Sequence, residues 1–123
     1  MSAYQGRFAG RTAVVTGGAS GLGKAAAARI VAEGGKVVLW DLNAEALTAA
    51  AAEVGAAHVI ALDVADPVAV AAAAEASAQA LDGRIDILVA SAGITGATVP
   101  VQEFPIDSWK RVVDINLNGV FYC

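Results

Sequence analysis

Metal ligands and disulfide partners are scarce in this sequence. It has 1 cysteine, Cys123, and 1 histidine, His58, which cannot form an internal disulfide and are too few for the usual zinc sites. Basic residues are also outnumbered, because 8 Lys and Arg against 12 Asp and Glu give a net charge of −4. Binding to a phosphate backbone requires a clustered basic face. We therefore expect no metal centre and no nucleic-acid partner.

Long apolar runs are absent too. The longest stretch without a charged residue, 87–102, contains Ser, Gly, Thr and Pro and falls short of the about 18 apolar residues that a membrane-spanning helix needs. The N-terminal segment MSAYQGRFAGRT has no apolar block of the about 7–15 residues that is typical of a signal peptide. These absences predict a cytoplasmic protein that does not associate with membranes.

Short segments rich in β-branched residues alternate with helical patterns. Strands are expected at residues 12–16, 36–41, 58–62 and 85–90. Helices are expected at residues 23–33, after an Asn43 cap to 54, after an Asp66 cap to about 81, and after an Asp107 cap. Strands joined by such helices pair in parallel with right-handed crossovers. The sequence therefore predicts an α/β fold, a Rossmann-type doubly wound parallel sheet, in one domain over residues 1–123.

The last predicted helix ends without a cap. Its predicted apolar stripe continues up to the last residue, Cys123. The stripe comprises Trp109, Val112, Val113, Asn116, Val120 and Phe121. A doubly wound sheet normally continues beyond four strands, and an uncovered fourth strand would be an exposed edge. We interpret the fold as truncated after the fourth strand and the helix that follows it, or as completed by another chain.

A glycine-rich turn, TGGASGLG at residues 16–23, lies between the first strand and the first helix. Gly17 permits the tight turn, Gly21 lets the backbone approach a pyrophosphate, and Gly23 brings the helix against the strand. The amides of the first helical turn favour an anion, and the Ser20 hydroxyl adds a donor. We assign Gly17, Ser20, Gly21, Leu22 and Gly23 to a dinucleotide site; the alternative is a connector without a ligand.

An acidic residue, Asp41, ends the second strand, near the position at which a carboxylate meets the adenosine ribose of a dinucleotide. It would accept hydrogen bonds from both ribose hydroxyls and repel a 2′-phosphate. The next residue, Leu42, supplies no cation for such a phosphate. The pair favours NAD over NADP, and the alternative is that Asp41 serves only the turn.

Five features together resemble the short-chain dehydrogenase/reductase family. They are TGxxxGxG at residues 16–23, Asp41, Asp63-Val64, Ser91-Ala92-Gly93 and Asn116-Leu-Asn-Gly119. The resemblance covers the chain from about Phe8 onward. It implies an NAD-dependent oxidoreductase that transfers a hydride between a secondary alcohol or ketone and the nicotinamide.

The resemblance also implies roles for particular residues. Asp63 would bind the adenine amino group, Val64 would pack beside the ring, and Ala92 and Gly93 would line the cofactor's ribose. Asn116 would be the one catalytic residue present, holding a water in a proton relay. Without the resemblance, Asp63 is a capping carboxylate and Asn116 a buried structural amide.

The family's catalytic Ser and TyrxxxLys pair would lie beyond residue 123, since Tyr122 is followed only by Cys123. The chain alone is therefore expected to bind the cofactor without catalysing the reaction. A second departure is Ala90-Ser91, where the family often has two Asn, so the strand contacts there are expected to be weaker.

Other residues have plainer interpretations. Trp40 is expected in the core, His58 partly exposed, Asn118 facing solvent or a loop, and Asp82 and Asp86 in solvated turns. The loop at residues 94–104 would border the substrate, but it is too generic to select among the sugars, polyols, 3-oxoacyl thioesters and steroids that the family uses. The family usually forms tetramers, so a homo-oligomer is implied for the full-length protein. The alternatives are a methyltransferase using S-adenosylmethionine and a non-catalytic dinucleotide-binding module.

Overall fold

The computed structural model describes residues 4–123, which fold around a parallel sheet of 4 strands in the order β3-β2-β1-β4. The strands are β1 Thr12–Thr16, β2 Lys36–Asp41, β3 His58–Ala61 and β4 Ile87–Ala90. The predicted parallel α/β fold is confirmed. β3 and β4 are slightly shorter than predicted because the chain leaves the sheet at Leu62 and joins it only after Asp86.

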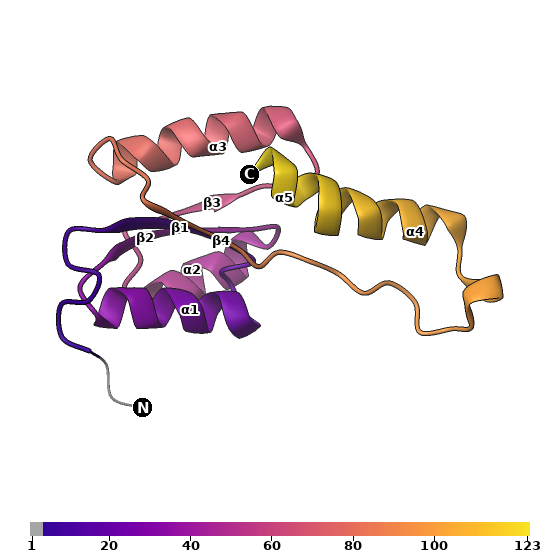
Figure 1. Cartoon of the computed structure of the whole chain (residues 1–123), viewed down its shortest axis with the longest axis horizontal. Coiled ribbons are helices and arrows are strands. Elements are labelled where there is room, and N and C mark those ends of the chain that lie inside the picture. The colour runs from indigo at the N-terminus through magenta and orange to yellow at the C-terminus, as the bar shows by residue number, and fades with distance from the viewer. Residues whose placement is uncertain (1–3) are drawn as a thin grey trace.

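Helices cover both faces of the sheet (Figure 1). α1 Gly21–Ala32 and α2 Ala44–Val54 lie on one face, and α3 Pro67–Ala80 and α5 Gly119–Tyr122 lie on the other. On the first face, Val15 and Leu39 pack with Ala27 and Leu47. On the second, Val14 and Trp40 pack with residues of α3 and with Ile115. Alternate residues of each buried strand therefore supply two separate cores.

Two of the predicted helix caps are confirmed by hydrogen bonds. Asn43 Oδ1 accepts from Ala46 N at 3.0 Å, and Asp66 Oδ1 accepts from Val68 N at 3.0 Å. The third prediction, a cap at Asp107, is wrong. Helix α4 Ile106–Val113 begins two residues earlier than predicted, after Pro105. Pro105 already has the extended backbone of a cap position, and Asp107 lies in the first turn, where the helix dipole favours a carboxylate.

The last helix is not regular. A π-helical segment, η2 Asp114–Asn118, separates α4 from α5. Its i→i+5 bonding adds a residue to the turn and rotates everything after it about the helix axis. The predicted apolar stripe is wrong: Trp109 is 61% and Phe121 85% exposed, while Ile115 and Gly119 are buried. Trp109 lies in α4, before the π-helical segment, where the helix extends away from the sheet (Figure 1).

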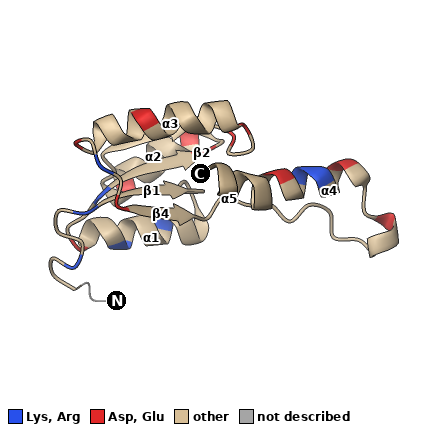
Figure 2. Cartoon of the chain, turned by 45° about the horizontal axis from the view of Figure 1, so that its top comes forward, with Lys and Arg blue, Asp and Glu red and all other residues tan. Residues whose placement is uncertain are grey.

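α4 extends away from the sheet at the end of a long loop (Figures 1 and 2). The loop follows β4 and contains a short 3-10 turn, η1 Val101–Glu103. In the view of Figure 2, both signs of charge are dispersed over the helices. No helix within residues 4–123 has the length and apolarity to span a bilayer.

The predictions for the remaining residues have mixed outcomes. Trp40 is buried and its Nε1 donates to Ser77 Oγ at 2.9 Å, His58 is exposed, and Asp82 is solvated as predicted. The prediction for Asp86 is wrong. Its Oδ2 accepts from Thr12 N at 2.9 Å, and its Oδ1 pairs with Arg84 at 2.8 Å. The reason is that β4 lies beside β1, which places Asp86 at the start of the neighbouring strand.

Candidate functional site

The carboxyl ends of the four strands meet at one edge of the sheet, and a cavity of about 390 Å³ opens there. This is where open α/β sheets hold their ligands. The cavity contains every predicted cofactor-binding residue except Gly23. These residues are Gly17, Ser20, Gly21, Leu22, Asp41, Leu42, Asp63, Val64, Ala92 and Gly93.

Three of the four glycines of the turn after β1, Gly17, Gly21 and Gly23, differ in what surrounds them. A Cβ on Gly17 would lie 2.8 Å from Ala92 N, and one on Gly23 would lie 2.3 Å from the Gly17 oxygen. Both glycines are therefore required by close backbone packing. Gly21 has a positive φ of 56°, but a Cβ there would meet no atom of the described residues within 4 Å. Its open side is the part of the turn that is free for a ligand.

The N-terminus of α1 borders this space, because Ser20, Gly21 and Leu22 line it. Ser20 is the N-cap residue, but its hydroxyl makes no capping hydrogen bond. The first intrahelical bond is the one from Lys24 N to Ser20 O at 3.2 Å. The amides before Lys24 therefore have no partner within the helix and carry its partial positive charge.

Asp41 joins the end of β2 to the glycine turn. Its Oδ2 accepts from Ala19 N at 3.1 Å and its Oδ1 from Leu42 N at 2.8 Å. Two acceptor positions of the carboxylate remain for hydroxyl donors. The half-buried carboxylate is thus fixed in orientation and still faces the cavity.

Thr16, the first residue of the glycine motif, has a hydrogen-bonding role beside this site that the sequence analysis did not assign. Its Oγ1 accepts from both Ser91 N and Ala92 N at 3.1 Å. These bonds link β1 to the turn after β4, and the pairing of the two strands continues to Thr16 and Ala90. The weaker contact that we expected at Ala90-Ser91 is therefore reinforced from the neighbouring strand. The only signal in the sequence was a hydroxyl residue at the end of a buried strand.

Asp63 follows β3 and receives two donors. Its Oδ1 accepts from Ala65 N at 3.0 Å, and its Oδ2 accepts from Arg111 Nη2 of α4 at 2.8 Å. Burial alone would raise the pKa of the Asp63 carboxyl. The bonds from Ala65 and Arg111 outweigh this effect and hold the pKa below its usual value. No sequence pattern indicated the contact with Arg111, which lies 48 positions from Asp63.

Asn116 lies in η2 beside the cavity, but it is exposed, so the interpretation as a buried amide is wrong. Its Oδ1 accepts from Ile94 N at 2.9 Å and its Nδ2 donates to Ile94 O at 2.7 Å. Asn116 thus faces the loop after β4, while its neighbour Ile115 takes the buried position. Asn118 is half-buried and donates to Asp114 Oδ1 at 2.9 Å within the same segment.

A second cavity, about 650 Å³, lies between the loop after β4 and α4. Its lining is mainly apolar and includes Phe104, Trp109 and Val112. Thr95 and Thr98 of the predicted substrate loop also line it.

Comparison with known proteins identifies the family. The sequence matches the short chain dehydrogenase family over residues 11–123. This chain belongs to that family. The match confirms the resemblance seen in the sequence and leaves the methyltransferase alternative without support.

Several short-chain dehydrogenases resemble this chain. It is 70% identical over 123 residues to 2-dehydro-3-deoxy-L-rhamnonate dehydrogenase (NAD(+)) of Sphingomonas sp. (strain SKA58), covering 100% of this chain and 49% of the relative. It is 44% identical over 119 residues to D-threitol dehydrogenase of Mycolicibacterium smegmatis, covering 94% and 45%. The chain thus spans about half the length of the curated relatives it matches.

Solved short-chain dehydrogenase structures share its fold. NAD+-bound xylitol dehydrogenase superposes with a TM-score of 0.89 at 38% identity, covering 94% of this chain and 46% of that one. Carveol dehydrogenase from Mycobacterium avium in complex with NAD gives 0.87 at 28% identity, covering 96% and 48%.

Proposed function

We propose that residues 1–123 form an NAD-binding domain and that the cavity at the strand ends holds the dinucleotide. The observation that carries this proposal is the pairing of an open glycine turn with a fixed carboxylate. Gly21 leaves space in front of the α1 amides, and Asp41 faces the same cavity from β2. The volume of about 390 Å³ is within the range of about 300–1,000 Å³ that is usual for ligand sites.

Each end of the cavity suits a different part of NAD. The amides at the start of α1 and the Ser20 hydroxyl would bind the diphosphate. Asp41 would accept from the adenosine ribose hydroxyls. A 2′-phosphate placed about 4 Å from the Asp41 carboxylate would be repelled by about 4 kcal/mol per charge at an effective dielectric of about 20. This repulsion supports NAD over NADP.

The other strand ends would hold the remaining groups. Asp63 and Val64 lie together at the end of β3, where a carboxylate acceptor adjoins an apolar surface. This combination suits the amino group and the ring of adenine. Ala92 and Gly93 leave the end of β4 free of large side chains, which suits a second ribose.

We also propose that the whole protein is an NAD-dependent oxidoreductase acting on a secondary alcohol or ketone of a small polyol or sugar acid. Bound NAD would supply a hydride acceptor, and NADH a hydride donor. The names of the relatives, a rhamnonate-type dehydrogenase and a threitol dehydrogenase, support this substrate class. The homo-oligomeric state and the cytoplasmic location remain predictions.

Asn116 would act in this site by positioning. Its amide holds the backbone of Ile94, which lines the cavity, against η2. One N–H and one oxygen lone pair of the amide remain free to hold a water, as the proposed proton relay requires.

Titration with NAD and NADP tests the site. Trp40 lines the cavity, so tryptophan fluorescence reports binding, and calorimetry gives an independent dissociation constant. We expect NAD to bind more tightly than NADP. Because residues 1–123 are expected to bind NAD without catalysing, the reaction is tested on the full-length protein, by reduction of NAD with 2-dehydro-3-deoxy-L-rhamnonate or with a tetritol. A full-length protein that binds NAD but does not reduce it with these alcohols would favour the non-catalytic module, and an absence of binding would reject both proposals.

A further inference from the structure

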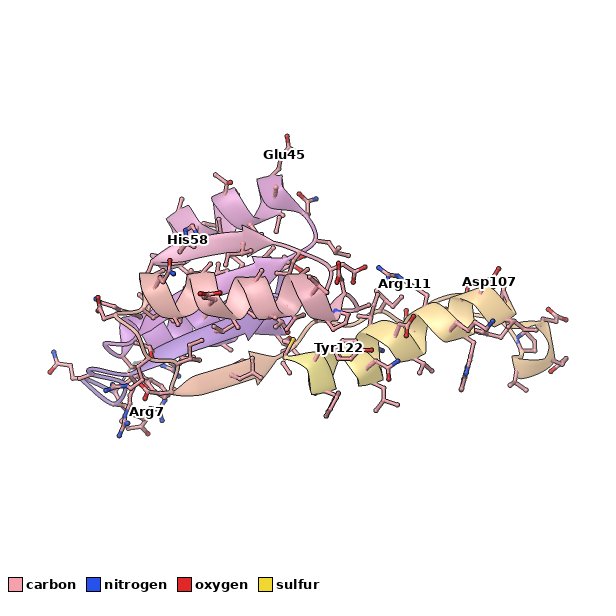
Figure 3. All side chains as sticks on the ribbon, turned by 90° about the horizontal axis from the view of Figure 1, so that it is seen from above. Arg7, Glu45, His58, Asp107, Arg111 and Tyr122 are labelled. Carbon is pink, nitrogen blue, oxygen red and sulfur yellow. The ribbon has the colours of Figure 1, made fainter. Side chains whose placement is uncertain are left out.

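The ion pair between Arg111 and Asp63 joins α4 to the rim of the cavity. Arg111 extends from α4 toward the carboxyl ends of the strands (Figure 3), and its Nη2 lies 2.8 Å from Asp63 Oδ2. Asp63 lines the cavity and Arg111 does not. Any effect of Arg111 on a ligand in the cavity would therefore act through the carboxylate.

The two donors to Asp63 fix the plane of its carboxylate. Ala65 N binds Oδ1 at 3.0 Å from the segment after β3, and Arg111 binds Oδ2 from a separate helix. A carboxylate has about four acceptor positions on its two oxygens. Since two are occupied, the remaining ones can accept a further N–H without displacing Arg111.

The ion pair with Arg111 also determines which chemical groups of a ligand the Asp63 carboxylate can bind. An ionised carboxylate only accepts hydrogen bonds. It therefore attracts an exocyclic amino group and repels a carbonyl oxygen in the same place. Removal of Arg111 would leave Asp63 Oδ2 without this donor. The carboxylate could then rotate about its Cβ–Cγ bond, and it would also hold a proton more readily.

We propose that Arg111 is a positioning residue that sets the Asp63 carboxylate to select a 6-amino purine over a 6-oxo purine at the adenosine end of the dinucleotide. The inference rests on the proposed NAD site, but it assigns the selectivity to an ion pair with a helix outside the cavity. A role confined to anchoring α4 would affect both purines equally.

The test compares NAD with nicotinamide hypoxanthine dinucleotide, which has a 6-oxo group in place of the amino group. Dissociation constants for both are measured by calorimetry on the protein and on its Arg111→Met variant. We expect the unaltered protein to prefer NAD, and this preference to fall by about three- to tenfold in Arg111→Met. Arg111→Lys, which keeps a cationic donor, should restore part of it.

Two further variants make the result specific. Lys110→Met removes the same charge from the neighbouring exposed position of α4 and should leave the preference unchanged. Asp63→Asn introduces an N–H donor beside the cavity and should shift the preference toward the hypoxanthine dinucleotide. This shift provides a check that does not depend on the folding of Arg111→Met.

The outcomes separate this inference from the proposed function. If the protein binds NAD but Arg111→Met weakens both dinucleotides by the same factor, Arg111 only anchors the helix and the inference is overturned. The inference is also overturned if the unaltered protein binds the two dinucleotides equally. If neither dinucleotide binds to the unaltered protein, the proposed NAD site itself is wrong.

Discussion

Asn116 and Ile94 are joined by a pair of hydrogen bonds, one in each direction between the side-chain amide and the backbone. The distances are 2.9 Å from Ile94 N to Oδ1 and 2.7 Å from Nδ2 to Ile94 O. The amide also approaches Gly93, where a Cβ would lie 3.3 Å from Asn116 Oδ1. The π-helical segment and the turn after β4 are therefore held together at the cavity by one side chain.

Asn116→Ala should loosen this junction. Two exposed hydrogen bonds are lost, so we expect the free energy of unfolding to fall by about 1–2 kcal/mol and the affinity for NAD to fall as well. Urea denaturation and calorimetry measure the two effects. Asn118→Ala is the matched control, because it removes one bond to Asp114 within the same segment. Equal losses of NAD affinity in the two variants would contradict the role of Asn116.

Asp41→Ala should shift the preference from NAD toward NADP. The variant removes the carboxylate that would repel a 2′-phosphate, and the ratio of the NADP and NAD dissociation constants should fall by at least about tenfold. Because Asp41 also binds Ala19 N and Leu42 N, Asp41→Asn serves as a control that keeps an acceptor there. An unchanged ratio in Asp41→Ala would count against the assigned role.

Substitutions of two glycines in the turn after β1 should separate effects on folding from effects on NAD binding. Gly21→Ala has open space for its methyl group and only the cost of a positive φ, roughly 1–2 kcal/mol, so the fold should persist while NAD affinity drops. Gly23→Ala places a Cβ 2.3 Å from the Gly17 oxygen and should destabilise the fold itself. Thermal unfolding with and without NAD distinguishes them. Normal NAD affinity in Gly21→Ala would place the diphosphate elsewhere.

Acid should destabilise the protein through Glu33. Its buried carboxylate pairs with Arg7, whose position Figure 3 labels, and lies 3.4 Å from Arg29 Nη1 and 3.1 Å from Tyr4 N. Burial raises the pKa of Glu33, but these partners outweigh it and the pKa is lowered overall. The stabilisation is therefore complete above the ordinary glutamate pKa and is lost as the pH falls through the lower pKa of the folded state.

Glu33→Gln tests this pH dependence. The variant should be less stable than the unaltered protein at neutral pH, and its free energy of unfolding should change less between neutral and acidic pH. Glu45→Gln, at an exposed position in the first turn of α2, should keep the original pH profile. Urea midpoints measured across the acidic range give the comparison, and parallel profiles for all three proteins would refute the assignment.

The predictions from sequence were most successful where the determinants are local. The turn at residues 16–23 was predictable because glycines and a following helix define its geometry within a few residues. Asp41 was predicted at the ligand site because it ends a parallel strand next to the glycine turn, whereas the role of Asp63 was implied only by the family resemblance. The cap at Asp107 failed because the extended backbone of Pro105 already starts the helix two residues earlier, which places Asp107 inside the first turn.

The sequence alone determined the alternation of strands and helices, the parallel pairing and the glycine turn that borders the cavity. The tertiary structure alone decided which side chains fix those residues. Thr16 reaches Ser91 across 75 positions and Arg111 reaches Asp63 across 48, and no local pattern encodes such contacts. The buried side of the last helix was also beyond prediction, because the apolar pattern of α4 continues where that helix extends away from the sheet. In η2, Ile115 is buried, and its neighbour Asn116 instead holds Ile94.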